Sequence, residues 1–412
     1  MKAEIIAVGT EMLMGQIVNT NAPYLADQLR QLGISHYYET VVGDNPNRLM
    51  AVTKIAESRS DLLIYTGGIG PTRDDLTKQT LSDYLDEPLI HDENTVAAIK
   101  QWLAERQRKV TANNLQQALT FQNGVSLKNP VGQAVGTAIT KHGKTYIFMP
   151  GFPNEMRAMF TASVIPYLRR LSNDSTLITS SYLNYFGIGE AALADKIDDL
   201  IAKQTNPTLA IYASGRTVTV RVSASGKDET DNREKLKAMQ RQLNERLGDY
   251  YYAEGLNIYP NTAVVEQLKA SGKTISCCES LTGGLASDQL VSVPGASAIF
   301  RGGLVTYDAH AKIRVAGVSS DTIAEHGMVS VACAREMALG AKERLASDVA
   351  ISFTGVAGPD QMEGQPVGSV FIGIAGLGTE PLILHEQFQG TRAFIRQRAV
   401  DRAFFELLKK LK

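Results

Sequence analysis

The feature that most constrains the fold of this chain is a repeated alternation of short apolar segments with amphipathic helical patterns. Over the first 170 residues, such apolar segments alternate with segments whose apolar positions recur every three or four residues. This alternation predicts a parallel sheet with helices on both faces. The expected elements are strands at Glu4–Val8, His36–Val42, Leu62–Thr66 and Thr145–Met149, and helices that include Ala22–Leu32 and Leu49–Ser58.

The same alternation returns from Leu256 onward, and the segment between the two regions is set off by composition shifts at Leu171–Ser175 and Gly248–Gly255. The fold prediction is α/β: two domains with mostly parallel or mixed sheets, at 1–170 and 256–412, joined by a small α+β module at 176–250 that serves as spacer or dimerisation unit. The elements expected in the last domain are strands at Thr274–Cys278, Gly303–Tyr307, Val349–Phe353, Val370–Ile374 and Ile383–Phe388, and an amphipathic helix at Thr391–Leu411.

Charge and cysteine content narrow the classes of partner. The chain has 42 basic and 43 acidic residues, a balance that disfavours nucleic acid as a direct partner. No apolar run approaches the ~20 residues that span a bilayer, so no membrane partner is expected. Two of the three cysteines, Cys277 and Cys278, are adjacent, which favours buried, inert thiols in a reducing compartment. We expect a cytoplasmic protein that acts on small molecules and, by base rate, is a homodimer.

A glycine-rich turn follows the expected strand at Thr274–Cys278, in the stretch "SCCESLTGG". Thr282, Gly283 and Gly284 precede a helical pattern, so their backbone N–H groups can face a negative charge. Ser280 would lie at the mouth of the same turn. Serine is common at helix N-caps, and the local sequence favours a cap over a nucleophile.

The segment "GGLVTYDAHAKIR" supplies a base for that serine, because serine–lysine pairs replace serine–histidine pairs in some enzymes. Lys312 can act as a base only when it is neutral, which requires burial or a second cation such as Arg301 or Arg314 to lower its pKa. A Tyr307 hydroxyl between serine and lysine would relay the proton. The alternative is a packed tyrosine and a solvated lysine, and the residues alone leave the two readings even.

A second glycine-rich turn, "TGGIGPTRDD", follows the expected strand Leu62–Thr66 and predicts a phosphate cradle at Thr66, Gly67, Gly68 and Gly70. Asp74 and Asp75 can hold a divalent cation through their oxygens, or can simply favour the start of a helix. In a doubly wound sheet, further acidic residues would approach the same crevice; these are Glu11, Asp44 and Glu155.

Five segments, "ESLTGG", "TYDAHAK", "FTGVAGPD", "PVGSVFIG" and "FQGTRAFIRQRA", resemble the carboxy-terminal domain of the CinA family of competence/damage-inducible proteins. The resemblance implies a nicotinamide mononucleotide (NMN) amidase that needs no cofactor and releases nicotinate mononucleotide and ammonia. Ser280 is then the nucleophile, Lys312 the base assisted by Tyr307, and the N–H groups of Thr282–Gly284 are candidates for binding the oxyanion. The expected phosphate site is formed by Thr354, Gly355, Gly358 and Arg392, whereas Arg396 is expected to be a solvated helix residue.

The segments "GTEMLMGQIVNTNA", "TGGIGPTRDDLT", "ANNLQQA", "KNPVGQAVG" and "MPGFPNEM" are similar to the amino-terminal domain of the same family. That resemblance implies the fold of molybdopterin-binding proteins and an ADP-ribose pyrophosphatase that depends on a divalent metal ion. Phe152 departs from the family's usual Pro-Gly-Pro-Pro and makes that turn bulkier. Together the two activities would recycle pyridine nucleotides. The alternatives are a non-catalytic nucleotide- or pterin-binding protein of competence or DNA repair, and a pterin-binding protein of molybdenum-cofactor assembly.

Overall fold

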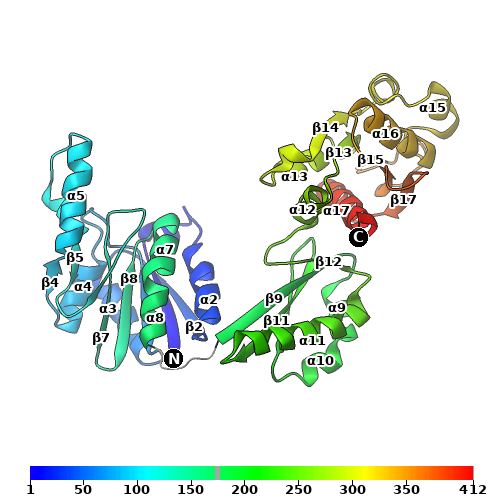
Figure 1. Cartoon of the computed structure of the whole chain (residues 1–412). Coiled ribbons are helices and arrows are strands. Elements are labelled where there is room, and N and C mark those ends of the chain that lie inside the picture. The colour runs from blue at the N-terminus through cyan, green and yellow to red at the C-terminus, as the bar shows by residue number, and fades with distance from the viewer. Residues whose placement is uncertain (172–176, 412) are drawn as a thin grey trace. The chain divides into compact units, whose positions relative to one another are not determined.

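The computed structural model describes residues 1–171 and 177–411 and separates into two compact units. The first unit contains the amino-terminal α/β domain, and the second contains most of the small module and the carboxy-terminal domain (Figure 1). The predicted linker at Leu171–Ser175 lies, apart from Leu171, outside the described residues. No helix in the described residues is long and apolar enough to cross a membrane.

A six-stranded sheet in the order β2-β1-β3-β8-β7-β6 forms the centre of the amino-terminal domain. The first four strands of that order are parallel, and β7 and β6 are antiparallel to their neighbours. The chain reverses its direction of winding between β1 and β3, so the carboxyl ends of these two strands border a crevice. The strands are β1 Lys2–Val8, β2 Ser35–Val42, β3 Leu62–Thr66, β6 Val125–Leu127, β7 Gly136–Lys141 and β8 Lys144–Met149, with a separate pair formed by β4 Leu89–His91 and β5 Leu119–Phe121.

Helices cover both faces of this sheet, and each face has its own apolar core (Figure 1). One core joins the sheet to α2, α7, η1 and α8, and the other joins it to α3 and α4. The fold therefore has the layers that the alternating pattern predicted. The helices are α1 Thr10–Leu13, α2 Asn21–Gln31, α3 Pro46–Glu57, α4 Thr77–Leu85, α5 Glu93–Glu105, α6 Ala112–Gln116, α7 Pro153–Met159, the π-helical turn η1 Phe160–Val164 and α8 Ile165–Leu171.

The middle module is an antiparallel sheet in the order β10-β11-β9-β12, with its core against three helices. The expected break at Gly248–Gly255 is wrong in part, because β12 lies within it and pairs with β9. The segment "GDYYYAEG" has three adjacent tyrosines and no alternation of apolar and polar residues, so it does not identify a strand without its partner. The elements are β9 Leu177–Tyr185, α9 Glu190–Lys196, α10 Asp198–Ala202, β10 Thr208–Ala213, β11 Val218–Gly226, α11 Glu229–Leu247 and β12 Tyr251–Glu254.

The carboxy-terminal domain has a five-stranded mixed sheet in the order β14-β13-β15-β16-β17. The first three of these strands are parallel, and the last two run antiparallel. The expected strand at Gly303–Tyr307 is displaced, because β14 starts at Phe300 and ends at Val305; the two glycines inside it hide the pattern. The strands are β13 Ile275–Glu279, β14 Phe300–Val305, β15 Val349–Gly355, β16 Ser369–Ala375 and β17 Leu382–Gln387.

Two cores also sandwich this sheet, and alternate residues of β13 contribute to them: Cys277 to one and Cys278 to the other. Cys277 and Cys278 are free and buried, as predicted, and so is Cys333; burial raises the pKa of Cys278 to about 11. One core contains α12 Pro260–Ser271, α13 Leu285–Val291 and α17 Arg392–Leu411; the other contains η3 Lys312–Ala316, α15 Ser320–His326 and α16 Val331–Arg344. The remaining short turns are η2 Ala296–Ala298 and α14 Ala309–Ala311.

Candidate functional site

The carboxyl ends of the parallel strands β13, β14 and β15 lie at one edge of the carboxy-terminal sheet, and polar residues follow each of them. Ser280 comes directly after β13, whereas Tyr307 and Lys312 follow β14. The structure brings Ser280 and Lys312 together: Lys312 Nζ lies 2.9 Å from Ser280 Oγ and donates a second hydrogen bond of 2.8 Å to the carbonyl of Thr306. This is the serine–lysine contact that the sequence left open.

The lysine amine is almost completely removed from water. Lys312 is 1% exposed and Ser280 is 8% exposed. Burial lowers the pKa of Lys312 from its ordinary value, and no carboxylate pairs with its amine in the described residues. Neither Arg301 nor Arg314 contributes to that lowering, so burial replaces the second cation that we considered. The amine therefore holds its proton less tightly than an exposed lysine does, and it contacts the serine oxygen.

Local structure around Lys312 explains its position. Asp308 caps α14 by accepting a hydrogen bond from the amide of Ala311, at 2.7 Å. The chain then continues into the π-helical turn η3, which begins at Lys312 and ends before Gly317, a residue with φ of +77°. Single π-turns of this kind are frequent at functional sites. The turn directs the lysine side chain into the core and back toward the end of β13.

Tyr307 does not lie between the serine and the lysine, which corrects our expectation of a bridging hydroxyl. Its side chain is 62% exposed, and its hydroxyl accepts a hydrogen bond of 3.0 Å from Arg392. The physical reason is that β14 ends at Val305, so the backbone after it carries Thr306 toward the core and Tyr307 toward solvent. Lys312 reaches Ser280 without a relay.

Glu279 organises the glycine-rich turn, a role that the sequence reasoning missed. Its buried carboxylate accepts hydrogen bonds from the amides of Gly284, Ala286 and Ser287 at 3.0, 3.0 and 2.9 Å, and from Ser287 Oγ at 2.7 Å. It thereby satisfies backbone N–H groups at the start of α13, which have no partner within the helix. An acidic residue at the end of an apolar strand, just before a helix, was the signal that could have identified it.

Because Glu279 takes the amide of Gly284, and the carbonyl of Ser280 takes the amide of Gly283, neither of these two groups is free to bind an oxyanion. The amides of Leu281 and Thr282 have no acceptor within the described residues. They directly follow the serine, where an oxyanion donor is expected. Of the predicted donors Thr282–Gly284, the structure therefore excludes Gly283 and Gly284 and leaves the amide of Thr282, next to that of Leu281, able to donate.

Arg396 is not a solvated residue, contrary to our expectation. It is half-buried, and its Nη2 donates to the carbonyl of Thr282 at 2.5 Å. Two buried polar atoms of this pair, Arg396 Nε and Thr282 Oγ1, have no hydrogen-bond partner in the described part of the chain. Unpaired buried polar atoms beside a candidate nucleophile indicate the position of a ligand. Arg396 lies one turn after Arg392 on the same helical face, which was the available sequence signal.

The remaining predicted phosphate ligands divide into two groups. Arg392 donates to the carbonyl of Gly358 at 2.7 Å as well as to Tyr307, so these three residues form one wall near the strand ends. Thr354 donates its hydroxyl to the carbonyl of Met328 at 2.6 Å, and a Cβ on Gly355 would lie 2.6 Å from the carbonyl oxygen of Ser369. Contacts with the protein itself account for a threonine at 354 and a glycine at 355, and the role of both residues in phosphate binding stays a prediction.

The amino-terminal domain has a second candidate site, at the crevice between β1 and β3. Gly67 and Gly68 have φ of +110° and +67°, and a Cβ on Gly67 would lie only 2.1 Å from the carbonyl oxygen of Val8. Thr66 anchors the turn by donating to the carbonyl of Pro150 at 2.9 Å. The amides of Gly68, Ile69 and Gly70 have no acceptor among the described residues. Such a run of free N–H groups is a cradle for phosphate oxygens.

Carboxylates border this cradle. Asp75 accepts hydrogen bonds from the amide and hydroxyl of Thr72 at 2.8 and 2.6 Å, and Asp74 is exposed. Both precede α4, whose first turn contains no acidic residue, so they do not belong to the helix start. In residues 1–171 and 177–411 no group of three His, Cys, Asp or Glu can hold a metal ion. Two carboxylates fit only a cation that keeps water or phosphate oxygens as its other ligands, as Mg²⁺ does.

The other predicted acidic residues follow the same strand ends. Asp44 accepts hydrogen bonds from the amide and hydroxyl of Thr10 at 2.9 and 2.8 Å, which ties the loop after β2 to the loop after β1. Glu11 lies in α1, in the segment that follows β1. Glu155 of α7 accepts a hydrogen bond of 2.7 Å from Asn129. Phe152 is 75% exposed at the start of α7, so its bulk faces outward from the core.

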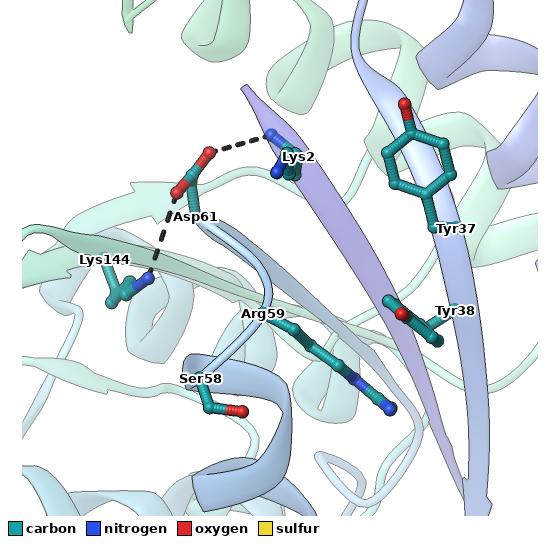
Figure 2. A pocket seen from close by; sticks show the side chains of 7 residues that line it. All are labelled: Lys2, Tyr37, Tyr38, Ser58, Arg59, Asp61 and Lys144. Atoms are coloured by element: carbon teal, nitrogen blue, oxygen red, sulfur yellow. Dashed lines mark hydrogen bonds and ion pairs between the residues drawn. The ribbon is translucent and has the colours of Figure 1, made fainter.

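A pocket of about 410 Å³ lies at the opposite edge of this sheet, at the amino ends of β1 and β8 (Figure 2). Three of its charged side chains already pair with protein atoms: Arg59 binds Glu4 through two hydrogen bonds, and Lys144 binds the carbonyl of Ser60 and the carboxylate of Asp61. Figure 2 shows Asp61 between Lys144 and the backbone of Lys2. Because Arg59, Lys144 and Asp61 already pair with one another or with protein atoms, this pocket is not the candidate site.

Comparisons with protein families cover the three parts of the chain. Residues 4–170 match the probable molybdopterin binding domain, residues 180–253 match the damage-inducible protein CinA KH domain, and residues 259–411 match the CinA C-terminal domain. KH domains clamp nucleic acid with a G-x-x-G loop between two helices. Here α9 and α10 meet at Ile197 without glycine, so the absence of a nucleic-acid partner stays our prediction.

Relatives that match this chain over its full length are named for the same family as these domains. Proteins named competence-damage inducible protein from Bacillus cereus strain Q1 and Bacillus thuringiensis strain Al Hakam are each 42% identical over 411 residues, which is 100% of this chain and 99% of theirs. Crystal structures of a CinA superfamily protein from Klebsiella pneumoniae and of CinA from Thermoplasma acidophilum are 32% and 33% identical. They cover 37% and 39% of this chain, and 95% and 94% of their own, each with a TM-score of 0.36.

Proposed function

Since this chain belongs to the CinA family of competence/damage-inducible proteins, we propose that its carboxy-terminal domain is an amidohydrolase that converts NMN to nicotinate mononucleotide and ammonia. The observation that supports this proposal most is the contact of 2.9 Å between Ser280 Oγ and the amine of Lys312, which is buried and has no carboxylate partner among the residues that the structure describes. A binding protein has no need of a buried lysine amine, with its pKa lowered by burial, in contact with a serine hydroxyl.

The proposed reaction has two halves. Neutral Lys312 takes the hydroxyl proton as Ser280 Oγ bonds to the carboxamide carbon, and the amides of Leu281 and Thr282 donate to the oxygen that becomes negative. The C–N bond then breaks, and Lys312 returns the proton to the departing ammonia. Water hydrolyses the acyl-serine by the same steps, which releases the carboxylate and restores the hydroxyl.

The nucleotide phosphate needs positive charge at the same strand ends. Arg392 and Arg396 lie one turn apart on α17, beside Tyr307 and Thr282. Arg396 Nε and Thr282 Oγ1, both unpaired in the described structure, would donate to the substrate. In this proposal Tyr307 holds Arg392 in place and does not carry the proton.

The test of this function is ammonia release from NMN by the full chain, with nicotinamide riboside as a comparison that lacks the phosphate. We expect turnover of NMN and a much weaker reaction with the riboside. Binding of NMN without ammonia release would favour the second candidate function, a non-catalytic nucleotide- or pterin-binding protein of competence or DNA repair. The family name is the observation that supports that second candidate.

The pH dependence of this reaction follows from the lowered pKa of Lys312. The amine accepts the serine proton only when neutral, so kcat/KM for NMN should rise with pH through the lowered pKa and level off above it. The midpoint should lie below 10.5, the ordinary lysine value, because burial disfavours the charged form. A rate that falls over this range, or that is flat from mildly acidic to alkaline pH, would contradict a neutral lysine base.

For the amino-terminal domain we propose hydrolysis of ADP-ribose at the β1–β3 crevice. The free amides of Gly68, Ile69 and Gly70 support phosphate binding, and the carboxylates of Asp74 and Asp75 would hold the divalent cation. When bound, such a cation offsets the charge of the diphosphate. The protein's own contribution is to fix the phosphates on the glycine turn.

A chelator is expected to reduce ADP-ribose hydrolysis at least about 100-fold, since Lewis-acid stabilisation contributes several kcal/mol, and added Mg²⁺ should restore it. Asp74→Asn should raise the Mg²⁺ concentration that gives half-maximal rate. Asp83→Asn, which removes an exposed acid of α4, is the matched control and should leave that concentration unchanged. Equal rates with and without chelator would remove the cation from the proposal.

A further inference from the structure

A second cavity of the amino-terminal domain, of about 600 Å³, lies beside α5 and is separate from the glycine turn. One face of α5 lines it, with Thr95, Ala98 and Trp102 at the spacing of successive helical turns. The loop from Lys128 to Val135 forms another part of its lining. Its volume is in the range of small-molecule sites.

The chemistry of the cavity suits a flat ring. Trp102 and the side chains of Ala98, Ile99 and Val135 supply aromatic and apolar surface, and Trp102 already packs against the guanidinium of Arg106 at 4.2 Å. The acidic group of the cavity, Asp92, is occupied by hydrogen bonds from protein atoms. Against the effect of burial, these neutral donors lower the pKa of Asp92, so the carboxylate keeps its charge, but its oxygens are engaged by Thr95 and Ser126.

Two donors of the cavity lack an acceptor. Gln133 Nε2 is buried and has no hydrogen-bond partner in the described residues. Lys128 is exposed at the rim, and no ion pair of its amine occurs in the described chain. Leaving a buried amide donor unpaired costs about 1–3 kcal/mol, a cost that a ligand acceptor would remove. A ligand with a hydrogen-bond acceptor on its ring would pair with Gln133 Nε2, and a negative charge at the rim would pair with the amine of Lys128.

The cavity is joined to the candidate site at the β1–β3 crevice by hydrogen bonds. Asn129, part of its lining, donates to Glu155 just after β8, at 2.7 Å. The amide of Val135 donates to the carbonyl of Gln117 at 3.0 Å, and the neighbouring Gln116 donates to the carbonyl of Asp75 at 3.1 Å. The loop that lines the cavity is therefore held next to the residues proposed to bind phosphate.

We infer that this cavity binds the heterocyclic ring of a nucleotide, with Gln133 donating to a ring nitrogen or carbonyl and Trp102 packing on the ring. The inference extends the proposed function of the amino-terminal domain, because it assigns the ring of the substrate to a cavity away from the phosphates. It depends on ring binding and not on hydrolysis.

Trp102 is the only tryptophan of the chain, so its fluorescence reports on this cavity alone. The experiment titrates the full-length protein with AMP and, separately, with ribose 5-phosphate, which has the same sugar and phosphate without the ring. We expect saturable quenching with AMP and at least about tenfold weaker binding of ribose 5-phosphate. Gln133→Leu should weaken AMP binding about 5- to 10-fold through the lost hydrogen bond, whereas Gln122→Leu, at an exposed glutamine of the same domain, should not.

Equal affinity for AMP and ribose 5-phosphate, or no change of fluorescence at saturating AMP, would overturn the inference. The comparison of ligands uses the unaltered protein, so it decides the matter even if Gln133→Leu folds poorly. Failure of ADP-ribose hydrolysis together with selective quenching by AMP would reject the proposed pyrophosphatase and keep the ring site. Hydrolysis of ADP-ribose without preferential binding of AMP over ribose 5-phosphate would keep the proposed pyrophosphatase and reject the ring site.

Discussion

Replacing Ser280 by alanine is expected to lower kcat for NMN by about 10⁴- to 10⁶-fold, because removal of a nucleophile leaves only binding and oxyanion stabilisation. Lys312→Met should lower it by about 10²- to 10⁴-fold, the usual contribution of a general base. The two losses should not add, since both residues act in one proton transfer across 2.9 Å. Ammonia release by the single and double variants measures all three values.

Stability separates this prediction from simple unfolding. Lys312→Met replaces a buried amine by an apolar side chain of similar length but leaves the carbonyl of Thr306 without its donor, so the free energy of unfolding should fall by no more than about 1–3 kcal/mol while activity is lost. Lys273→Met, at an exposed lysine of the same domain, is the matched control and should leave both quantities unchanged. An active Lys312→Met variant would show that some other group takes the serine proton.

The second large effect is expected at Glu279, which holds the turn after Ser280. Glu279→Ala leaves the amides of Gly284, Ala286 and Ser287 without their acceptor in a buried region, and unsatisfied donors cost about 1–3 kcal/mol each. We expect the free energy of unfolding of the domain to fall by about 3 kcal/mol or more, and kcat for NMN to fall with it because Ser280 loses its fixed position. Denaturant unfolding followed by circular dichroism gives the first value.

Glu279→Gln tests the same role more gently, because the amide oxygen can still accept from part of the turn. It should lose less stability than Glu279→Ala. Glu343→Ala removes an exposed acid of α16 and should change stability by no more than about 0.5 kcal/mol. If Glu279→Ala were as stable as this control, the carboxylate would not be what holds the start of α13.

Much of the fold was predictable because strands and helices in an α/β chain repeat over short distances. Leu62–Thr66 was located to the residue, and the layers of the first domain, a sheet with helices on both faces, were predicted, whereas the strand order comes from the structure. The short strands β6 and β12 were not predicted, because each depends on a partner strand for its stability. Likewise β14 was misplaced, since its glycines have no strand preference of their own.

The corrections at the candidate site have a different cause. Tyr307 was placed as a bridge and Arg396 as a solvated residue, yet the first faces Arg392 and the second reaches the carbonyl of Thr282. Those contacts join residues 85 and 114 positions apart in the chain. No local pattern specifies which of two neighbouring side chains faces the core when the strand before them ends two residues early.

What the amino-acid sequence by itself determined is the set of chemical groups and the strand end that each one follows, because strand ends and glycine turns are properties of a few adjacent residues. The tertiary structure alone decided which of those groups are buried and which donors are already taken. Lys312 becomes a candidate base only because the sheet and its covering helices exclude water around its amine. In the turn after Ser280, Glu279 takes the amide of Gly284 and the carbonyl of Ser280 takes that of Gly283, while the amides of Leu281 and Thr282 have no acceptor in the described residues. Desolvation and hydrogen-bond pairing depend on every element packed around a residue, so they exist only once the chain has folded.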